Sequence, residues 1–170
     1  MSAENLETLV WAPSPQEVAN EHLWVLREVE NIGPDTLQKL AARAASVRRY
    51  SYSPYSGYRV GAAILTVSGL IGDAANVEVV TYSETGHAEE EAAKKLALSG
   101  EIMLSGRRFI RAVAVAHAGT SNPCGRCRQV LAEFADNALI LAVRPNGQIH
   151  RITSLKILLP DAFTPRDLGK

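Results

Sequence analysis

The spacing of apolar residues in the first part of the chain predicts a helix. Four apolar side chains fall on one helical face, at relative positions 0, 7, 8 and 11: Val18, Val25, Leu26 and Val29. The helix is expected to start after Ser14 and to end at Gly33, because Pro34 cannot continue it. A second helix is expected from Asp35, with Gln38 three residues later in a capping-box pattern.

From residue 58 onward the apolar pattern changes to runs typical of β-strands, separated by two further helical segments. Strands are predicted at 58–67, 70–75, 109–116, 139–143 and 148–152, and helices at 87–98 and 124–135. The latter helix is expected to be capped by Asn122, with Pro123 in its first turn. This order predicts an α/β fold, α-β-α layered, in which a mixed β-sheet of about five strands is flanked by helices. We therefore expect an N-terminal helical extension (residues 1–34) and one sheet-containing domain (residues 35–170).

The charge balance of the chain argues against nucleic acid as a partner. The 170 residues contain 18 lysines and arginines and 18 aspartates and glutamates, so the formal net charge is zero, whereas a polyphosphate backbone requires a basic surface. No apolar run approaches the roughly 18 residues of a membrane-spanning helix. The N-terminal segment also lacks the basic start and apolar stretch of a secretory signal. We expect a soluble, cytoplasmic protein that binds neither nucleic acid nor a membrane.

Both cysteines of the chain, Cys124 and Cys127, lie in a single C-x-x-C motif. Two cysteines cannot form the disulfide framework of a small secreted domain. At the start of the predicted helix, unpaired N–H groups favour the thiolate form of both side chains. The motif is compatible with a redox dithiol and with one half of a metal site, and its spacing alone leaves both possibilities open.

One of the four histidines, His87, has the sequence context of a metal ligand, because it forms a His-x-Glu motif with Glu89. The others are expected to be ordinary hydrogen-bonded or solvated residues: His22, His117 and His150. One imidazole and two thiolates balance the charge of Zn²⁺ and leave a fourth position for water, which ionises near neutral pH on the ion. A carboxylate at Glu89 could take the proton of that water. The alternative is that Glu89 is a solvated helix residue, as Glu90 and Glu91 are expected to be.

A His-x-Glu motif followed downstream by Pro-Cys-x-x-Cys is the signature of zinc deaminases. Around it, this chain resembles the cytidine deaminase family, specifically its short-chain, usually homotetrameric kind. The resemblance extends from about residue 35 to residue 168, and its motifs lie at residues 52–63, 76–78, 87–89, 123–129 and 158–163.

The resemblance implies a cofactor, a set of site residues and a quaternary structure. One Zn²⁺ per subunit would be held by His87, Cys124 and Cys127, with Glu89 as the catalytic residue. Five substrate-binding residues are also implied: Asn76 and Glu78 at the ribose 3′-hydroxyl, Tyr58 in the base pocket, the backbone N–H of Ala88 at the pyrimidine carbonyl, and Phe163 in a neighbouring subunit's site. The implied partners are a pyrimidine nucleoside and three further copies of this chain in a homotetramer.

The chain departs from the short-chain pattern at four positions in or near the motifs. Many members resembling this chain carry Cys where His87 stands and Arg where Glu90 stands. Three thiolates leave one negative charge in excess, which that arginine offsets by hydrogen bonding to sulfur. A neutral imidazole removes the excess charge, so we expect no compensating cation at position 90. Val79 replaces the usual Asn and, like the hydroxyl of Tyr58, bears on the choice of nucleoside.

The sequence therefore predicts a zinc-dependent hydrolytic deaminase that converts cytidine or deoxycytidine to uridine or deoxyuridine plus ammonia. Within the same class, the substrate could instead be a base-modified cytidine or a cytosine-nucleoside antibiotic similar to blasticidin S. Outside that class, the alternatives are a non-catalytic binding module stapled by zinc and a dithiol redox protein. The resemblance also implies a role in pyrimidine salvage.

Overall fold

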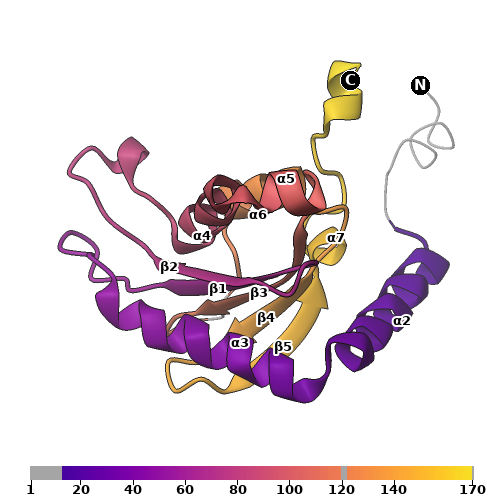
Figure 1. The fold of residues 1–170 in the computed structure, drawn as a ribbon, viewed down its shortest axis with the longest axis horizontal. Coiled ribbons are helices and arrows are strands. Elements are labelled where there is room, and N and C mark those ends of the chain that lie inside the picture. The colour runs from indigo at the N-terminus through magenta and orange to yellow at the C-terminus, as the bar shows by residue number, and fades with distance from the viewer. Residues whose placement is uncertain (1–12, 120–121, 170) are drawn as a thin grey trace, which may run out of the picture.

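The computed structural model describes residues 13–119 and 122–169 as three layers, helix, sheet and helix (Figure 1). The first 12 residues of the expected extension lie outside this described part. The strands are β1 (Gly61–Thr66), β2 (Ile71–Ala75), β3 (Ile110–Ala116), β4 (Leu139–Val143) and β5 (Ile149–Ser154). The helices are α2 (Pro15–Ile32), α3 (Pro34–Val47), α4 (Ala88–Leu96), α5 (Ile102–Ser105), α6 (Gly125–Glu133) and α7 (Leu155–Leu158).

The five strands form one mixed sheet in the order β2-β1-β3-β4-β5, which confirms the predicted fold class. Strands β3 and β4 are parallel, and the other neighbouring pairs are antiparallel. Gly61, at the start of β1, pairs with Ala75 at the end of β2 and with Ala116 at the end of β3. The chain therefore enters β1 and leaves β2 and β3 at the same edge of the sheet.

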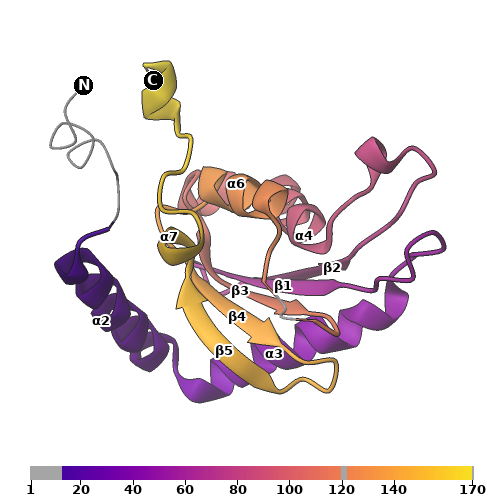
Figure 2. The same ribbon diagram turned by 180° about the vertical axis from the view of Figure 1, so that it is seen from behind.

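Each face of the sheet buries its own apolar cluster. On one face, α3 packs through Leu37, Leu40, Ala41 and Ala44 against alternate residues of the strands. On the other face, α4 and α6 cover a second cluster that contains Ile64, Val113, Ile140 and Leu131 (Figures 1 and 2). Because successive strand residues point to opposite faces, the apolar run of β4 and that of β3 from Ala112 onward serve both clusters and are buried, whereas Arg111 of β3 is only partly buried.

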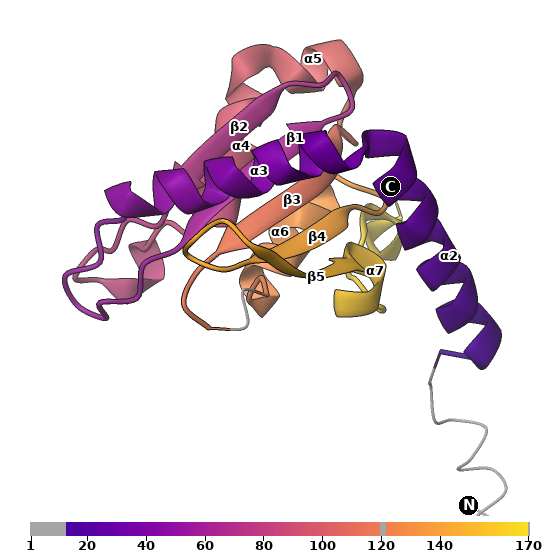
Figure 3. The same ribbon diagram turned by 90° about the horizontal axis from the view of Figure 1, so that it is seen from below.

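The N-terminal helix α2 lies beside the sheet next to β5 and meets the start of α3 at an angle (Figure 3). Ser14 and Glu17 form a capping box at its start. Its packing face contains Trp24, Val25 and Val29, which contact the cluster on the α3 side of the sheet. The predicted apolar stripe is therefore wrong at two of its four positions, since Val18 and Leu26 are exposed: 39% and 62%. Trp24, with its larger apolar surface, takes the contact instead.

Two predicted helix boundaries differ from the observed ones. No capping box forms at Asp35, since α3 begins at Pro34 and Gln38 donates instead to the carbonyl oxygen of Gly147 (3.2 Å). The helix predicted for 87–98 leaves α-helical geometry after Leu96, and a wider turn leads through Gly100 (φ +98°) into α5.

Candidate metal centre and catalytic site

The predicted site residues other than Phe163 lie near the edge of the sheet where β2 and β3 end. The loop before β1, the segments after β2 and β3, and the first turns of α4 and α6 all meet there (Figure 1). The end of α3 presses closely on Gly61, where a side-chain Cβ would lie 2.6 Å from the backbone nitrogen of Arg48. Only glycine fits at this position, so the start of β1 and the loop before it are held against the body of the domain.

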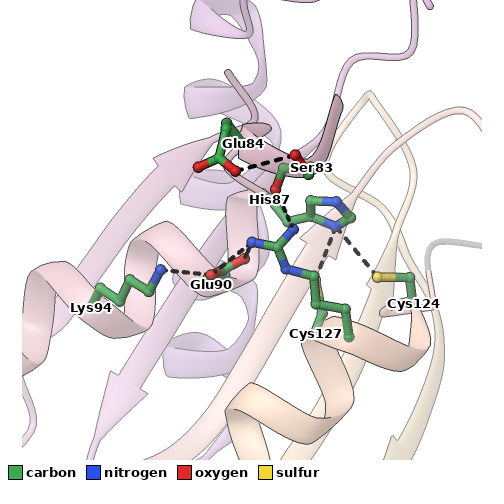
Figure 4. A network of polar contacts seen from close by, with 8 residues as sticks. Ser83, Glu84, His87, Glu90, Lys94, Cys124 and Cys127 are labelled. Atoms are coloured by element: carbon green, nitrogen blue, oxygen red, sulfur yellow. Dashed lines mark hydrogen bonds and ion pairs between the residues drawn. The ribbon is translucent and has the colours of Figure 1, made fainter. Parts of the chain in front are cut away.

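His87, Cys124 and Cys127 form the three-residue cluster able to hold a metal ion in the described part of the chain. His87 is the N-cap of α4, Cys124 is the N-cap of α6, and Cys127 lies one turn further along α6. The Nδ1 atom of His87 is 3.3 Å from Sγ of Cys124 and 3.4 Å from Sγ of Cys127 (Figure 4). Tetrahedral zinc with ordinary bond lengths places its N and S ligands about 3.5 Å apart. The donor set and its spacing therefore fit zinc, and three protein ligands leave one position open.

Hydrogen bonds from the side chain of Arg128 to backbone carbonyl oxygens hold the first turn of α6 in place. The helix begins at Gly125, so the expected cap at Asn122 is wrong: Cys124 occupies the N-cap position and Pro123 precedes the helix. Arg128 donates to the carbonyl oxygens of Pro123 (2.8 Å) and Leu158 (2.9 Å), which ties this turn to α7.

Burial shifts the pKa values of two of the three candidate ligands. It lowers the pKa of His87, and the nearby Arg126 guanidinium lowers it further, so the imidazole is neutral and able to bind a metal. Burial also raises the pKa of the Cys127 thiol well above its usual range. A metal cation reverses this preference, because a coordinating thiol is deprotonated.

Glu89 is the buried acid of the site. Only 4% of its surface is exposed, which excludes the alternative of a solvated helix residue. Burial raises the pKa of Glu89, against the opposing effects of its own backbone N–H and the side chain of Cys127. Its carboxyl group therefore contacts a metal ligand without belonging to the ligand set.

Asn76 and Glu78, the expected ribose ligands, hold the loop before β1. The side-chain oxygen of Asn76 accepts from Ser51 Oγ (2.6 Å) and Val60 N (2.8 Å), and its Nδ2 donates to Tyr58 O (2.9 Å). The Glu78 carboxylate accepts from the backbone nitrogens of residues 55 (2.9 Å) and 56 (3.2 Å) and from the Ser56 hydroxyl. Hydrogen bonding from Ser56 lowers the pKa of Glu78. Both side chains thus reach the site edge from the end of β2.

Tyr58 directs its hydroxyl at a histidine. The Tyr58 oxygen lies 2.6 Å from His117 Nδ1, and Gly119 N donates to the same nitrogen (2.9 Å). His117 is hydrogen-bonded, which is one of the two states expected from the sequence, but at 5% exposure it is buried and does not lie at the surface. Burial, followed by the charge of Glu89, raises the pKa of Tyr58.

Replacing Tyr58 by Phe is expected to lower the free energy of unfolding by about 1 kcal/mol, the usual net value of one hydrogen bond. The substitution leaves His117 Nδ1 without the hydroxyl at 2.6 Å. Urea denaturation measures the change, and Tyr52→Phe is the matched control because Tyr52 is 56% exposed. Equal stability of Tyr58→Phe and the wild type would contradict this hydrogen bond.

The last two expected site residues occupy different surroundings. Ala88 is fully buried and is the first residue of α4, where backbone N–H groups have no partner within the helix. Phe163 is 59% exposed, and its carbonyl oxygen accepts a hydrogen bond from Gln129 (2.7 Å). The segment that contains Phe163 projects from the body of the domain beyond α7 (Figure 2).

Arg126 is a site residue that was not expected from the sequence. It lies between the two ligand cysteines, and its Nη2 forms an ion pair with Glu90 Oε2 (2.9 Å). Glu90 is 4% exposed and is therefore not the solvated residue predicted for position 90. The signal for it in the sequence is the Cys-Gly-Arg-Cys spacing, which places this arginine close to both cysteines, whereas the short-chain pattern carries its arginine at position 90.

The layered fold and the open His-Cys-Cys site together are those of a zinc-dependent hydrolytic enzyme. Residues 34–143 match the family described as the cytidine and deoxycytidylate deaminase zinc-binding region. The cytidine deaminase of Sporosarcina psychrophila is 38% identical over 136 residues, which cover 78% of this chain and 95% of that protein. The crystal structure of cytidine deaminase from Burkholderia pseudomallei superposes with a TM-score of 0.66 at 34% identity, over 74% of this chain and 97% of that one. The chain belongs to the cytidine and deoxycytidylate deaminase family and is a zinc-dependent deaminase.

These matches also bear on the remaining alternatives. Membership of the family excludes the zinc-stapled binding module and the dithiol redox protein as accounts of the C-x-x-C motif. The similar cytidine deaminase of Mycobacterium tuberculosis, strain H37Rv, is 37% identical over 133 residues, or 77% of this chain and 92% of that protein. Within the described residues, no helix is both long and apolar enough to cross a membrane.

Proposed function

We propose that this protein hydrolyses cytidine and deoxycytidine to uridine and deoxyuridine with release of ammonia. The observation that carries the proposal is the placement of the buried Glu89 against Cys127, beside a ligand set that leaves one metal position open. Relatives named cytidine deaminase at 34–41% identity, each similar over more than three quarters of this chain, support the choice of nucleoside.

Glu89 acts as the proton carrier of the reaction. A zinc ion held by His87, Cys124 and Cys127 supplies the chemistry of making water acidic enough to attack carbon near neutral pH. Glu89 takes the proton of the attacking water and delivers it to N3 of the cytosine ring as the C4–O bond forms. It then assists proton transfer to the exocyclic nitrogen, so that the C4–N bond breaks and ammonia leaves. Burial suits Glu89 to this role, because a carboxyl with a raised pKa both accepts and returns a proton.

The nucleoside is held by groups along the same edge of the sheet. The free N–H groups at the start of α4 favour binding of the pyrimidine carbonyl oxygen at Ala88. Tyr58 contacts the base. Asn76 and Glu78 bind the ribose 3′-hydroxyl. Within the described residues, the partners of Asn76 engage one of its two amide hydrogens, and Glu78 accepts three hydrogen bonds of about four that a carboxylate can take. Each side chain thus retains capacity for a sugar hydroxyl.

The active unit is a homotetramer in which Phe163 enters the site of a neighbouring subunit. The exposure of this aromatic side chain and the projection of its segment from the body support an intersubunit role. One pyrimidine nucleoside and one zinc ion then belong to each site.

The protein works in the cytoplasm, in the salvage of pyrimidine nucleosides. Cys124 and Cys127 are free thiols, and a reducing compartment keeps such pairs available for zinc. The absence of net charge suits an uncharged nucleoside as the substrate.

The proposal is tested by an ultraviolet assay of deamination over a panel of cytidine, deoxycytidine, cytosine, CMP, 5-methylcytidine and blasticidin S. We expect cytidine and deoxycytidine to give the highest kcat/KM and the free base to be a poor substrate, because Asn76 and Glu78 require the sugar. A higher kcat/KM for the modified nucleoside or for the antibiotic would replace the proposed substrate, while the deaminase chemistry would stand.

A further inference from the structure

The two helices that carry the zinc ligands are joined by an ion pair which is not part of the ligand set. His87 and Glu89 belong to the start of α4, whereas Cys124 and Cys127 belong to the start of α6. Glu90 extends from the first turn of α4 to Arg126 in the first turn of α6, with Nη2 at 2.9 Å from Oε2 and 3.1 Å from Oε1.

Arg126 also binds the chain on the other side of His87. Its Nη1 donates to the carbonyl oxygen of Ser83 (3.4 Å), four residues before the ligand, while Glu90 follows the ligand by three residues. Figure 4 shows Ser83 and Glu90 on either side of His87, with Cys124 opposite the imidazole. One guanidinium group therefore contacts the chain on both sides of the histidine ligand, at the backbone carbonyl of Ser83 and at the side-chain carboxylate of Glu90.

The carboxylate in this ion pair is buried, which makes the contact more than a surface pair. The side chain of Glu90 is 5% exposed, that of Arg126 is 44% exposed, and Lys94 approaches Oε1 of Glu90 at 2.6 Å. Removing one partner of a pair with a buried charge is more costly than breaking an exposed pair. Glu90 and Arg126 also carry opposite charges, so the pair leaves unchanged the neutral balance of one imidazole, two thiolates and Zn²⁺.

We propose that Glu90 and Arg126 are positioning residues for the zinc site, which hold His87 at the correct distance from Cys124 and Cys127. This role rests on the proposed zinc site and does not depend on which nucleoside is the substrate. Hydrogen-bonded groups behind metal ligands commonly change metal affinity 10- to 100-fold when they are replaced. The positioning role of Glu90 is not evident from the sequence, because its charge is opposite to that of the arginine usual at this position.

The test is a double-mutant cycle of Glu90→Gln, Arg126→Gln and the combined variant, with zinc release to a chromogenic chelator as the measurement. We expect each single substitution to speed zinc release by about tenfold. The double variant is expected to release zinc no faster than the worse single variant, because the two residues act through one contact. Lys94→Gln is the matched control: it removes the other cation at Glu90 but leaves the link between α4 and α6 intact, and it is expected to release zinc at the wild-type rate.

A spectroscopic measurement separates positioning from a general loss of stability. In protein loaded with Co²⁺, the Arg126→Gln and Glu90→Gln variants are expected to shift the thiolate-to-cobalt charge-transfer band, whereas Lys94→Gln is not. Wild-type release rates and spectra in both single variants would overturn the proposal. It would also be overturned by rate effects that multiply in the double variant, since these would show that the residues act independently. Both outcomes leave the proposed nucleoside specificity untouched.

Discussion

Replacing Glu89 by Gln is expected to reduce kcat for cytidine by about a thousandfold or more, the scale of a lost general acid–base group. Glutamine has nearly the same shape but cannot accept the proton of water or return it to N3 and the leaving nitrogen. Zinc content is expected to remain at the wild-type level, because Glu89 is not among the three ligands. Steady-state kinetics and metal analysis of the same preparation measure both quantities.

The adjacent helix provides a matched control for this substitution. Glu91→Gln changes a partly exposed carboxylate two residues further along α4 and is expected to leave kcat unchanged. A Glu89→Gln enzyme that keeps zinc and turns over cytidine at a rate near that of the wild type would assign the proton transfer to another group.

The second large effect is expected from Cys127→Ser, which removes a buried ligand. Cys127 is fully buried and its Sγ lies 3.4 Å from His87 Nδ1. With two strong ligands left, purified protein is expected to contain little zinc and to show almost no deamination. Excess zinc in the assay is not expected to restore activity.

Thermal unfolding provides an independent measure of the same loss. A metal that binds the folded state at a free concentration 1,000 times its Kd stabilises that state by about 4 kcal/mol. Chelation is therefore expected to lower the Tm of the wild type but not that of Cys127→Ser. Equal zinc content in the two proteins would show that the metal is bound elsewhere.

The sequence determines the regular elements best where local pattern and burial agree. The predicted strand 139–143 coincides with β4, because an unbroken apolar run is bounded by a polar turn that ends at Gly147. The strand predicted from residue 58 begins only at Gly61. The side chain of Asn76 accepts a hydrogen bond from the backbone N–H of Val60, and the guanidinium of Arg48 donates one to the carbonyl oxygen of Arg59 at 3.0 Å. These contacts come from distant parts of the chain, so the local alternation of residues does not reveal them.

The same distinction applies to the site. His87 and Glu89 are two residues apart, and Cys124 and Cys127 three, so spacing alone predicts a ligand set with a nearby acid. The supporting contacts join distant residues: Tyr58 meets His117 across 59 positions, and Arg126 meets Glu90 across 36. Such pairs depend on how β1, β3 and the two helices pack, and a single sequence does not encode that packing in any local pattern.

The central claim is that zinc at His87, Cys124 and Cys127 supports hydrolytic deamination of a free cytosine nucleoside. It is tested most directly by titrating metal-free protein with zinc while measuring uridine and ammonia formed from cytidine. We predict that activity rises linearly and saturates at one zinc per chain, with one ammonia released for each uridine. Saturation of the site with zinc, without ammonia release from cytidine or deoxycytidine, would contradict it.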